Sequence, residues 1–125
     1  MKKIINVIWV LLILGAVLDG TQMRVKAGNL VYGDYEYSQN TSDKTISIIK
    51  YNGKDSEVEI PQKINGMNVV SISEEAFQFN DTIVDVVIPE GVTGIGSSAF
   101  SCCSNLKQVS FPDSLEKIGF TAFYN

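Results

Sequence analysis

The 125-residue sequence contains no histidine, one tryptophan and two cysteines. The absence of histidine excludes the usual catalytic triads and histidine zinc ligands. Cys102 and Cys103 are adjacent, whereas bridged cysteines usually hold their Cα atoms about 5.5 Å apart, so an ordinary disulfide between them is disfavoured. No Cys-x-x-Cys spacing and no glycine-rich phosphate loop occur. We therefore expect no enzyme, no metal site and no cofactor.

Long apolar runs are also scarce, and the single one lies at the N-terminus. Residues 4–18 are largely apolar, with Asn6 the one polar side chain, and Lys2 and Lys3 precede them. This pattern predicts a signal peptide over residues 1–27 and a secreted or cell-surface protein. The alternative is an uncleaved membrane anchor. Fifteen residues rise only about 22 Å as a helix, less than the ~30 Å hydrocarbon core, which favours cleavage.

Basic residues are few once that segment is set aside. The chain has 10 Lys and Arg against 14 Asp and Glu. Residues 28–125 keep 6 basic and 13 acidic residues, a net charge of −7, because Lys2, Lys3, Arg24, Lys26 and Asp19 all precede them. An acidic surface repels nucleic acid and anionic lipid, so we expect neither as a partner, and no membrane span after cleavage.

What the sequence does have is a repeat. Ala76-Phe77, Ala99-Phe100 and Ala122-Phe123 lie 23 residues apart. Other apolar positions keep the same step: Ile72, Ile95 and Ile118; Val86 and Val109; Ile88 and Phe111; Pro89 and Pro112. A period in the twenties predicts a repeat solenoid, mainly β, in which each copy is stacked on the next. We expect an N-terminal β capping segment over residues 28–57 and repeats over 58–125, the last copy incomplete.

Each coil is predicted to hold two short strands and a corner. Leu106, Val109 and Phe111 should point inward, and the serines before Ala99-Phe100 suggest a helical or 3₁₀ turn. Gly96 and Gly119 should take positive φ or allow a tight bend. An insertion at Asn65-Gly66 predicts a turn that lengthens the first coil.

Several side chains allow two interpretations. Tyr32, Tyr35 and Tyr37 indicate a cover for the open N-terminal end of the stack, or alternatively an aromatic binding face. Asn80 and Cys103 occupy equivalent positions and should hydrogen-bond the backbone at a tight corner; the alternative for Cys103 is a reactive thiol.

The acidic pairs also have two interpretations. Glu57 and Glu59 share one strand face, and Glu74 and Glu75 would begin a helical turn. We interpret both pairs as solvated faces, and a metal or acid–base site is the alternative.

The residues of one coil carry a family resemblance. Ile88-Pro89-x-x-Val92-x-x-Ile95-Gly96-x-x-Ala99-Phe100-x-x-Cys103-x-x-Leu106-x-x-Val109-x-Phe111-Pro112 resembles the BspA-type leucine-rich repeat of bacterial surface proteins. The resemblance implies a leucine-rich-repeat right-handed superhelix with a parallel sheet on its concave side. It also implies an exported protein used in attachment or recognition.

The outward side chains of the predicted sheet form our candidate site. Two rows are expected to face a protein partner, possible partners being host or extracellular surface proteins: Glu57, Asp85 and Gln108, with Glu59, Val87 and Ser110 beside them. The expected function is a non-catalytic binding or adhesion module. The alternatives are a structural spacer or fragment of a longer surface protein, and an accessory domain of a secreted enzyme. The uncovered last coil also suggests end-to-end self-association.

Overall fold

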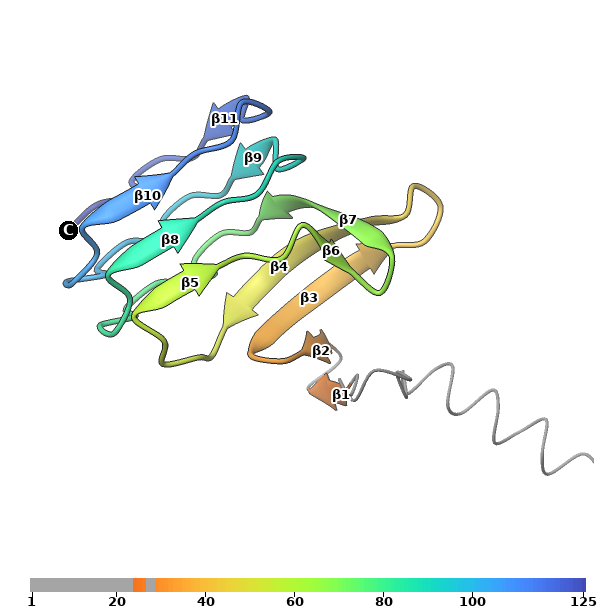
Figure 1. The fold of residues 1–125 in the computed structure, drawn as a ribbon, viewed down its shortest axis with the longest axis horizontal. Helices are drawn as coiled ribbons and strands as arrows, with labels where there is room; N and C mark the ends of the chain where they lie inside the picture. Colours follow the sequence, from red (N-terminus) through yellow and green to blue (C-terminus); the bar gives the residue numbers. More distant parts are fainter. Residues whose placement is uncertain (1–23, 27–28) are drawn as a thin grey trace, which may run out of the picture.

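The chain folds into a short stack of β-coils with an N-terminal cap (Figure 1). The computed structural model describes residues 24–26 and 29–125. The predicted signal peptide therefore lies almost wholly outside the described residues and stays a prediction. The strands are β1 (Arg24–Lys26), β2 (Asn29–Tyr32), β3 (Tyr35–Asn40), β4 (Thr45–Tyr51), β5 (Glu57–Glu59), β6 (Lys63–Ile64), β7 (Met67–Ile72), β8 (Asp85–Val87), β9 (Gly94–Ile95), β10 (Gln108–Ser110) and β11 (Lys117–Ile118).

The predicted solenoid of parallel strands is confirmed. Figure 1 shows β5, β8 and β10 stacked side by side as one wall, with β7, β9 and β11 forming the other. Alternating apolar residues fix the register of both walls, since a slip by one residue would expose every inward side chain. Val58 pairs with Val86, and Val86 with Val109, on one wall. On the other wall, Ile95 pairs with Ile72 and with Ile118.

The first coil is longer than the second, as the insertion predicts. The extra residues form an antiparallel hairpin in which β6 pairs with the start of β7. Asn65 and Gly66 join the two strands with φ of 51° and 77°. Positive φ at both central residues is typical of a type I′ turn, which suits the twist of a hairpin. The insertion is thus absorbed at the edge of a coil, and the register of the later coils is kept.

A β-hairpin closes the N-terminal end of the stack. β3 and β4 pair antiparallel, and β4 then pairs parallel with β7, so the cap continues the coil sheet. Tyr37 of β3 is fully buried, and the ring of Tyr35 lies 5.0 Å from that of Tyr51. Tyr32 and Tyr35 pack against the core as partly buried residues. The prediction that these tyrosines cover the end of the stack is confirmed.

The predicted helical or 3₁₀ turns at the corners are wrong, because the residues that the structure describes contain no helix. Each corner is a run of overlapping turns; in the first, the amides of Ala76, Gln78 and Asn80 donate to the carbonyls three residues before them. The amides of the residues between them form hydrogen bonds with the next coil instead; Phe77 N, for example, donates to Ala99 O at 2.7 Å. The left-handed φ of Glu75 (58°) is incompatible with a right-handed helix, so no helix can continue through this residue.

The glycines after the second strand have a different role from the expected one. Gly96 and Gly119 do not have positive φ. Instead, a Cβ on Gly96 would lie 2.6 Å from the carbonyl carbon of Ser73, and one on Gly119 equally close to that of Gly96. These glycines are required because successive coils approach each other closely there. Ser73 is the equivalent residue of the first coil and lies beside β4 of the cap; its amide donates to Ile48 O at 2.8 Å, as the Gly96 amide does to Ile72 O.

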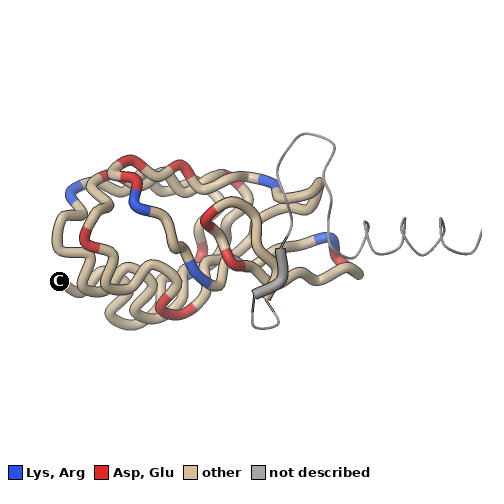
Figure 2. Tube along the Cα trace, turned by 90° about the horizontal axis from the view of Figure 1, so that it is seen from below, with Lys and Arg blue, Asp and Glu red and all other residues tan. Residues whose placement is uncertain are grey.

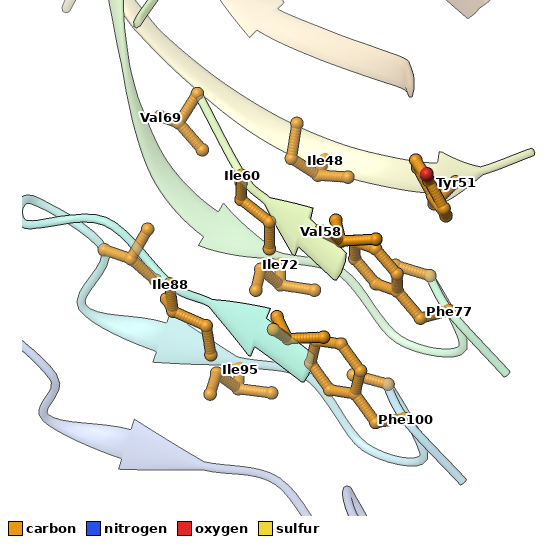
Figure 3. Close-up of a cluster of buried hydrophobic side chains, with 14 of the residues drawn as sticks. Ile48, Tyr51, Val58, Ile60, Val69, Ile72, Phe77, Ile88, Ile95 and Phe100 are labelled. Atoms are coloured by element: carbon orange, nitrogen blue, oxygen red, sulfur yellow. The ribbon is translucent and has the colours of Figure 1, made fainter. Parts of the chain in front are cut away.

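The core is a set of side-chain columns that run through the stack (Figure 3). In one column the isoleucines Ile60 and Ile88 repeat, and in another Ile72 and Ile95. A third column is aromatic: Phe77 lies 5.2 Å from Tyr51 and 4.6 Å from Phe100, and Phe123 lies 5.1 Å from Phe100. Each coil therefore completes the burial of its apolar side chains against its neighbours.

The last coil is covered on one side only within the described part of the chain. Phe111 and Ile118 are 49% and 52% exposed, whereas the equivalent Ile88 and Ile95 are buried. Phe111 still turns toward the stack, with its ring edge-on to Phe123 at 5.6 Å. Leu106 and Val109 are partly buried against the core. The expected inward direction is confirmed for these residues, but full burial is not reached.

Candidate binding surface

The outward rows predicted from the repeat period lie on the wall made by β5, β8 and β10. Glu57 pairs with Asp85 and Asp85 with Gln108, while Glu59 pairs with Val87 and Val87 with Ser110. Between the rows, Val58 and Val86 point into the core. Because neighbouring strands lie about 4.8 Å apart, each row presents its side chains at that spacing. All six predicted residues are thus brought together on one face.

Five of the six line a shared shallow hollow of about 450 Å³. These are Glu57, Glu59, Asp85, Val87 and Gln108, with Val58 at the floor. Ser110 lies beside the hollow at the end of its row and does not line it. Val87 is 43% exposed, which provides an apolar centre among polar side chains. Such a surface suits contact with a polypeptide better than enclosure of a small molecule.

The face is negatively charged. Three carboxylates and no Lys or Arg line the hollow. Further carboxylates lie close to its Glu59 end. The pKa of Tyr35 is raised there, mainly by burial and then by Tyr51, Asp34, Asp55 and Glu59. The Tyr35 hydroxyl donates to the Glu59 carbonyl at 3.4 Å, which joins the cap to β5. A basic partner is therefore favoured electrostatically.

Asp34 and Asp55 were missed by the sequence analysis. Asp34 lies in the turn between β2 and β3, and its carbonyl accepts a hydrogen bond from Asn52 N at 2.8 Å. Asp55 accepts a hydrogen bond from the Tyr51 hydroxyl at 3.1 Å. Both positions depend on how the cap docks on the first coil. The repeat period contains no information on this docking, although the sequence places Asp55 two residues before Glu57.

The corner residues Asn80 and Cys103 have the predicted structural role. Cys103 Sγ donates to Phe77 O at 3.1 Å, and burial raises the pKa of this thiol. Asn80 Nδ2 donates to Gly53 O at 3.3 Å, and its Oδ1 accepts from the amides of Thr82 and Ile83. A raised pKa keeps the Cys103 thiol protonated, which disfavours nucleophilic chemistry.

The acidic pairs lie on solvent-exposed positions. Glu57, Glu59, Glu74 and Glu75 are all exposed, so solvated faces are the correct description of both pairs. The expected helix N-terminus at Glu74 and Glu75 is wrong, since the corner is a turn. Within residues 24–26 and 29–125, no three His, Cys, Asp or Glu side chains are grouped so that they could hold a metal ion. The same residues form no helix with the length and apolarity needed to cross a membrane.

The sequence matches a known repeat family. Residues 70–125 match the family model described as "BspA type Leucine rich repeat region (6 copies)". No curated protein matches the chain. The match covers the second half of β7 and every later strand, which is the part of the chain with the strict 23-residue period.

Solved structures of bacterial leucine-rich repeat proteins are similar to this chain. The Treponema pallidum leucine-rich repeat protein is 33% identical with a TM-score of 0.70, covering 73% of this chain and 42% of that protein. A leucine-rich cell surface protein of Faecalibacterium prausnitzii is 29% identical with a TM-score of 0.69, covering 79% and 28%. A leucine-rich repeat protein of Bacteroides ovatus is 28% identical with a TM-score of 0.59, covering 68% and 24%.

This chain spans less than half the length of each of those three proteins. The likeness therefore concerns the repeat architecture, and what the longer proteins do as wholes is not transferred. The stacked coils, the 23-residue register and the family match agree with one another. Residues 70–125 of this chain are thus a region of BspA-type leucine-rich repeats.

Proposed function

We propose that this protein is an exported, non-catalytic binding module that acts at the cell surface or outside the cell. The observation that carries the proposal is the in-register acidic surface on β5, β8 and β10, where three coils present Glu57, Asp85 and Gln108 in one row. A partner that lies across the row touches several coils at once. The F. prausnitzii relative is described as a cell surface protein, which supports the proposed location.

The partner is a protein segment with basic character. The carboxylates of Glu57, Glu59 and Asp85 attract lysine and arginine, while the exposed Val87 offers an apolar contact at the centre. Rows of small and polar side chains give modest affinity, since few large anchors are present. Complementary charge accelerates association and makes it dependent on salt.

Charge reversal at the middle of the row tests this proposal. The Asp85→Arg variant of the full chain is titrated with a labelled polylysine peptide, and fluorescence anisotropy reports the Kd. Reversal removes one attraction and adds a repulsion, so we expect roughly tenfold weaker binding. The thermal unfolding midpoint should stay unchanged because Asp85 points away from the core.

Asp113→Arg is the matched control. It makes the same charge change on an exposed residue of the loop between β10 and β11 that does not line the hollow. Equal weakening by both variants would indicate net charge alone, and unchanged binding by Asp85→Arg would favour a spacer without its own ligand.

A second proposal concerns the uncovered coil. We propose that the chain self-associates end to end through this coil, because Phe111 and Ile118 are half exposed there. Among the residues that the structure describes, β10 and β11 are also the outermost strands of their sheets at this end, so each presents a strand edge to which another copy can pair.

A further inference from the structure

Phe79 is placed where neither the backbone nor burial favours a phenylalanine. Its side chain is 70% exposed, and its φ is 60°, in the left-handed region that bulky residues rarely adopt. The equivalent Cys102 has a φ of 58°, so the corner itself imposes this conformation. Phe79 N is fixed by a hydrogen bond to Ser101 O at 3.0 Å. Burial of this ring therefore contributes little to the stability of the fold, because most of the residue is in solvent.

The ring borders a hollow of about 310 Å³ between the cap and the first coil. Phe79 and Ile49 provide its apolar surface, and the carboxylates of Glu36, Glu74 and Glu75 are around it with the single ammonium of Lys50. This hollow shares no lining residue with the one on β5, β8 and β10. It is consequently a separate surface, at a junction that exists once in the chain.

Hydrogen bonds hold one wall of the hollow in place. Glu36 is only 7% exposed, and its two carboxylate oxygens accept hydrogen bonds from Asn29 Nδ2 at 3.1 Å and Asn52 Nδ2 at 3.0 Å. Glu74 and Glu75, by contrast, are exposed at the rim. Three carboxylates against one ammonium give the hollow a net negative charge. Its chemistry is complementary to a cationic side chain with an aliphatic stem.

We propose that this hollow binds a lysine or arginine side chain of a partner polypeptide, next to an apolar residue of that partner that packs on Phe79. The aliphatic stem lies along the Phe79 ring, and the charged head meets Glu74 and Glu75. Binding energy is usually concentrated in a few anchoring contacts, and the Phe79 ring is the large apolar group that this hollow offers as one. This surface adds a second contact to the one proposed on β5, β8 and β10.

The test uses the full chain and two labelled peptides, one of alternating lysine and leucine and one with glutamate in place of lysine. Fluorescence anisotropy measures each Kd. Phe79→Ala should weaken binding of the lysine peptide at least about tenfold, as expected for a dominant contact. Phe120→Ala is the matched control, because Phe120 is 84% exposed on another corner and does not line the hollow. It should leave the Kd unchanged, and the glutamate peptide should not bind.

A second variant separates binding from folding. Phe79→Asn places a residue that tolerates left-handed φ at this position, so the unfolding midpoint should rise by a few degrees while peptide binding is still lost. A rise in stability with loss of binding cannot come from a damaged fold.

Several results would overturn the proposal. These are no binding of the lysine peptide to the wild-type chain, an unchanged Kd in Phe79→Ala, or equal losses in Phe79→Ala and Phe120→Ala. If Asp85→Arg weakens binding and Phe79→Ala does not, the hollow is rejected and the surface on β5, β8 and β10 remains.

Discussion

At the residue scale, two glycines two positions apart show how the contact between coils constrains the sequence. A Cβ on Gly96 would overlap the backbone of Ser73 and Glu74, whereas a Cβ on Gly94 would meet nothing within 4 Å. Both glycines belong to the same segment, and only one is required by packing. The sequence alone does not distinguish them, because the distinction depends on the distance to the previous coil.

Gly96→Ala should therefore destabilise the protein, and Gly94→Ala should not. The backbone atoms near Gly96 cannot move without separating two coils, so we expect a loss of about 1–3 kcal/mol in the free energy of unfolding. Gly94→Ala should stay within about 0.5 kcal/mol of the wild type. Chemical denaturation of both variants measures the difference. Equal stabilities would contradict the close approach of the coils at Gly96.

The buried tyrosines predict how stability depends on pH. Burial, with the nearby Asp55, raises the pKa of Tyr51 from 10.0 to about 12. Below pH 10 the hydroxyl is protonated in both the folded and the unfolded chain, so it adds no pH dependence. Between pH 10 and about 12 only the unfolded chain releases the proton, and the free energy of unfolding must fall as pH rises.

Tyr51→Phe should make this alkaline decline shallower, as measured by denaturation at several pH values from neutral upward. A residual decline is expected because the pKa values of Tyr35 and Tyr37 are also raised by burial. A Tyr51→Phe protein with the same slope as the wild type would show that Tyr51 is not buried in the stack.

At the element scale, the period of apolar residues was sufficient to predict the two walls but not the corners. Val86 and Val109 could be placed in one register because strands alternate strictly and these copies keep the 23-residue step. Val58 precedes Val86 by 28 residues, and its place follows once the insertion at Asn65-Gly66 is allowed for. The conformation of the corners could not be predicted, because their amides alternate between hydrogen bonds within a turn and hydrogen bonds to the next coil. Serine and alanine fit a helical turn equally well, and nothing local indicates the left-handed φ of Ser98.

The two candidate surfaces also differ in whether the sequence predicts them. The six residues on β5, β8 and β10 follow from the period, and the structure places them together. The hollow beside Phe79 could not be predicted, since it forms only where the cap contacts the first coil.

The aromatic column predicts a gradient of stability along the stack. Phe77 lies between the rings of Tyr51 and Phe100, whereas Phe123 has Phe100 on one side and the edge of Phe111 beside it. Phe77→Ala should cost about 3–5 kcal/mol, because a large cavity opens between two filled layers. Phe123→Ala should cost clearly less, since Phe123 is only partly buried. Denaturation midpoints of both variants test the order, and a larger loss in Phe123→Ala would contradict it.

At the scale of the whole molecule, Figure 2 shows acidic residues at several places around the coils. In the two walls they lie on β5 and β8, whereas β7, β9 and β11 carry no Asp or Glu. The excess of Asp and Glu, together with the two acidic hollows, favours basic protein partners over nucleic acid. Two separate acidic surfaces on one small stack allow a partner to contact the module at more than one point, which would raise affinity through effective concentration.

The uncovered coil predicts that the 125-residue chain associates reversibly at high concentration. Sedimentation velocity should show a mean sedimentation coefficient that rises with concentration. Ile118→Lys adds a charge to a free strand edge and should suppress this association. Phe120→Lys, on the exposed corner of the same coil, is the control and should have little effect. Association that is equally sensitive to both variants would indicate unspecific contacts.

The most direct test of the account is the distance between Glu57 and Gln108, the two ends of the acidic row. Spin labels are attached at both positions in a chain with Cys102→Ser and Cys103→Asn, the latter copying the equivalent Asn80. In the stack these positions are two strand spacings apart, about 10 Å, so the spectrum should show strong dipolar broadening. A spectrum identical to that of a mixture of the two singly labelled proteins would contradict the in-register stack.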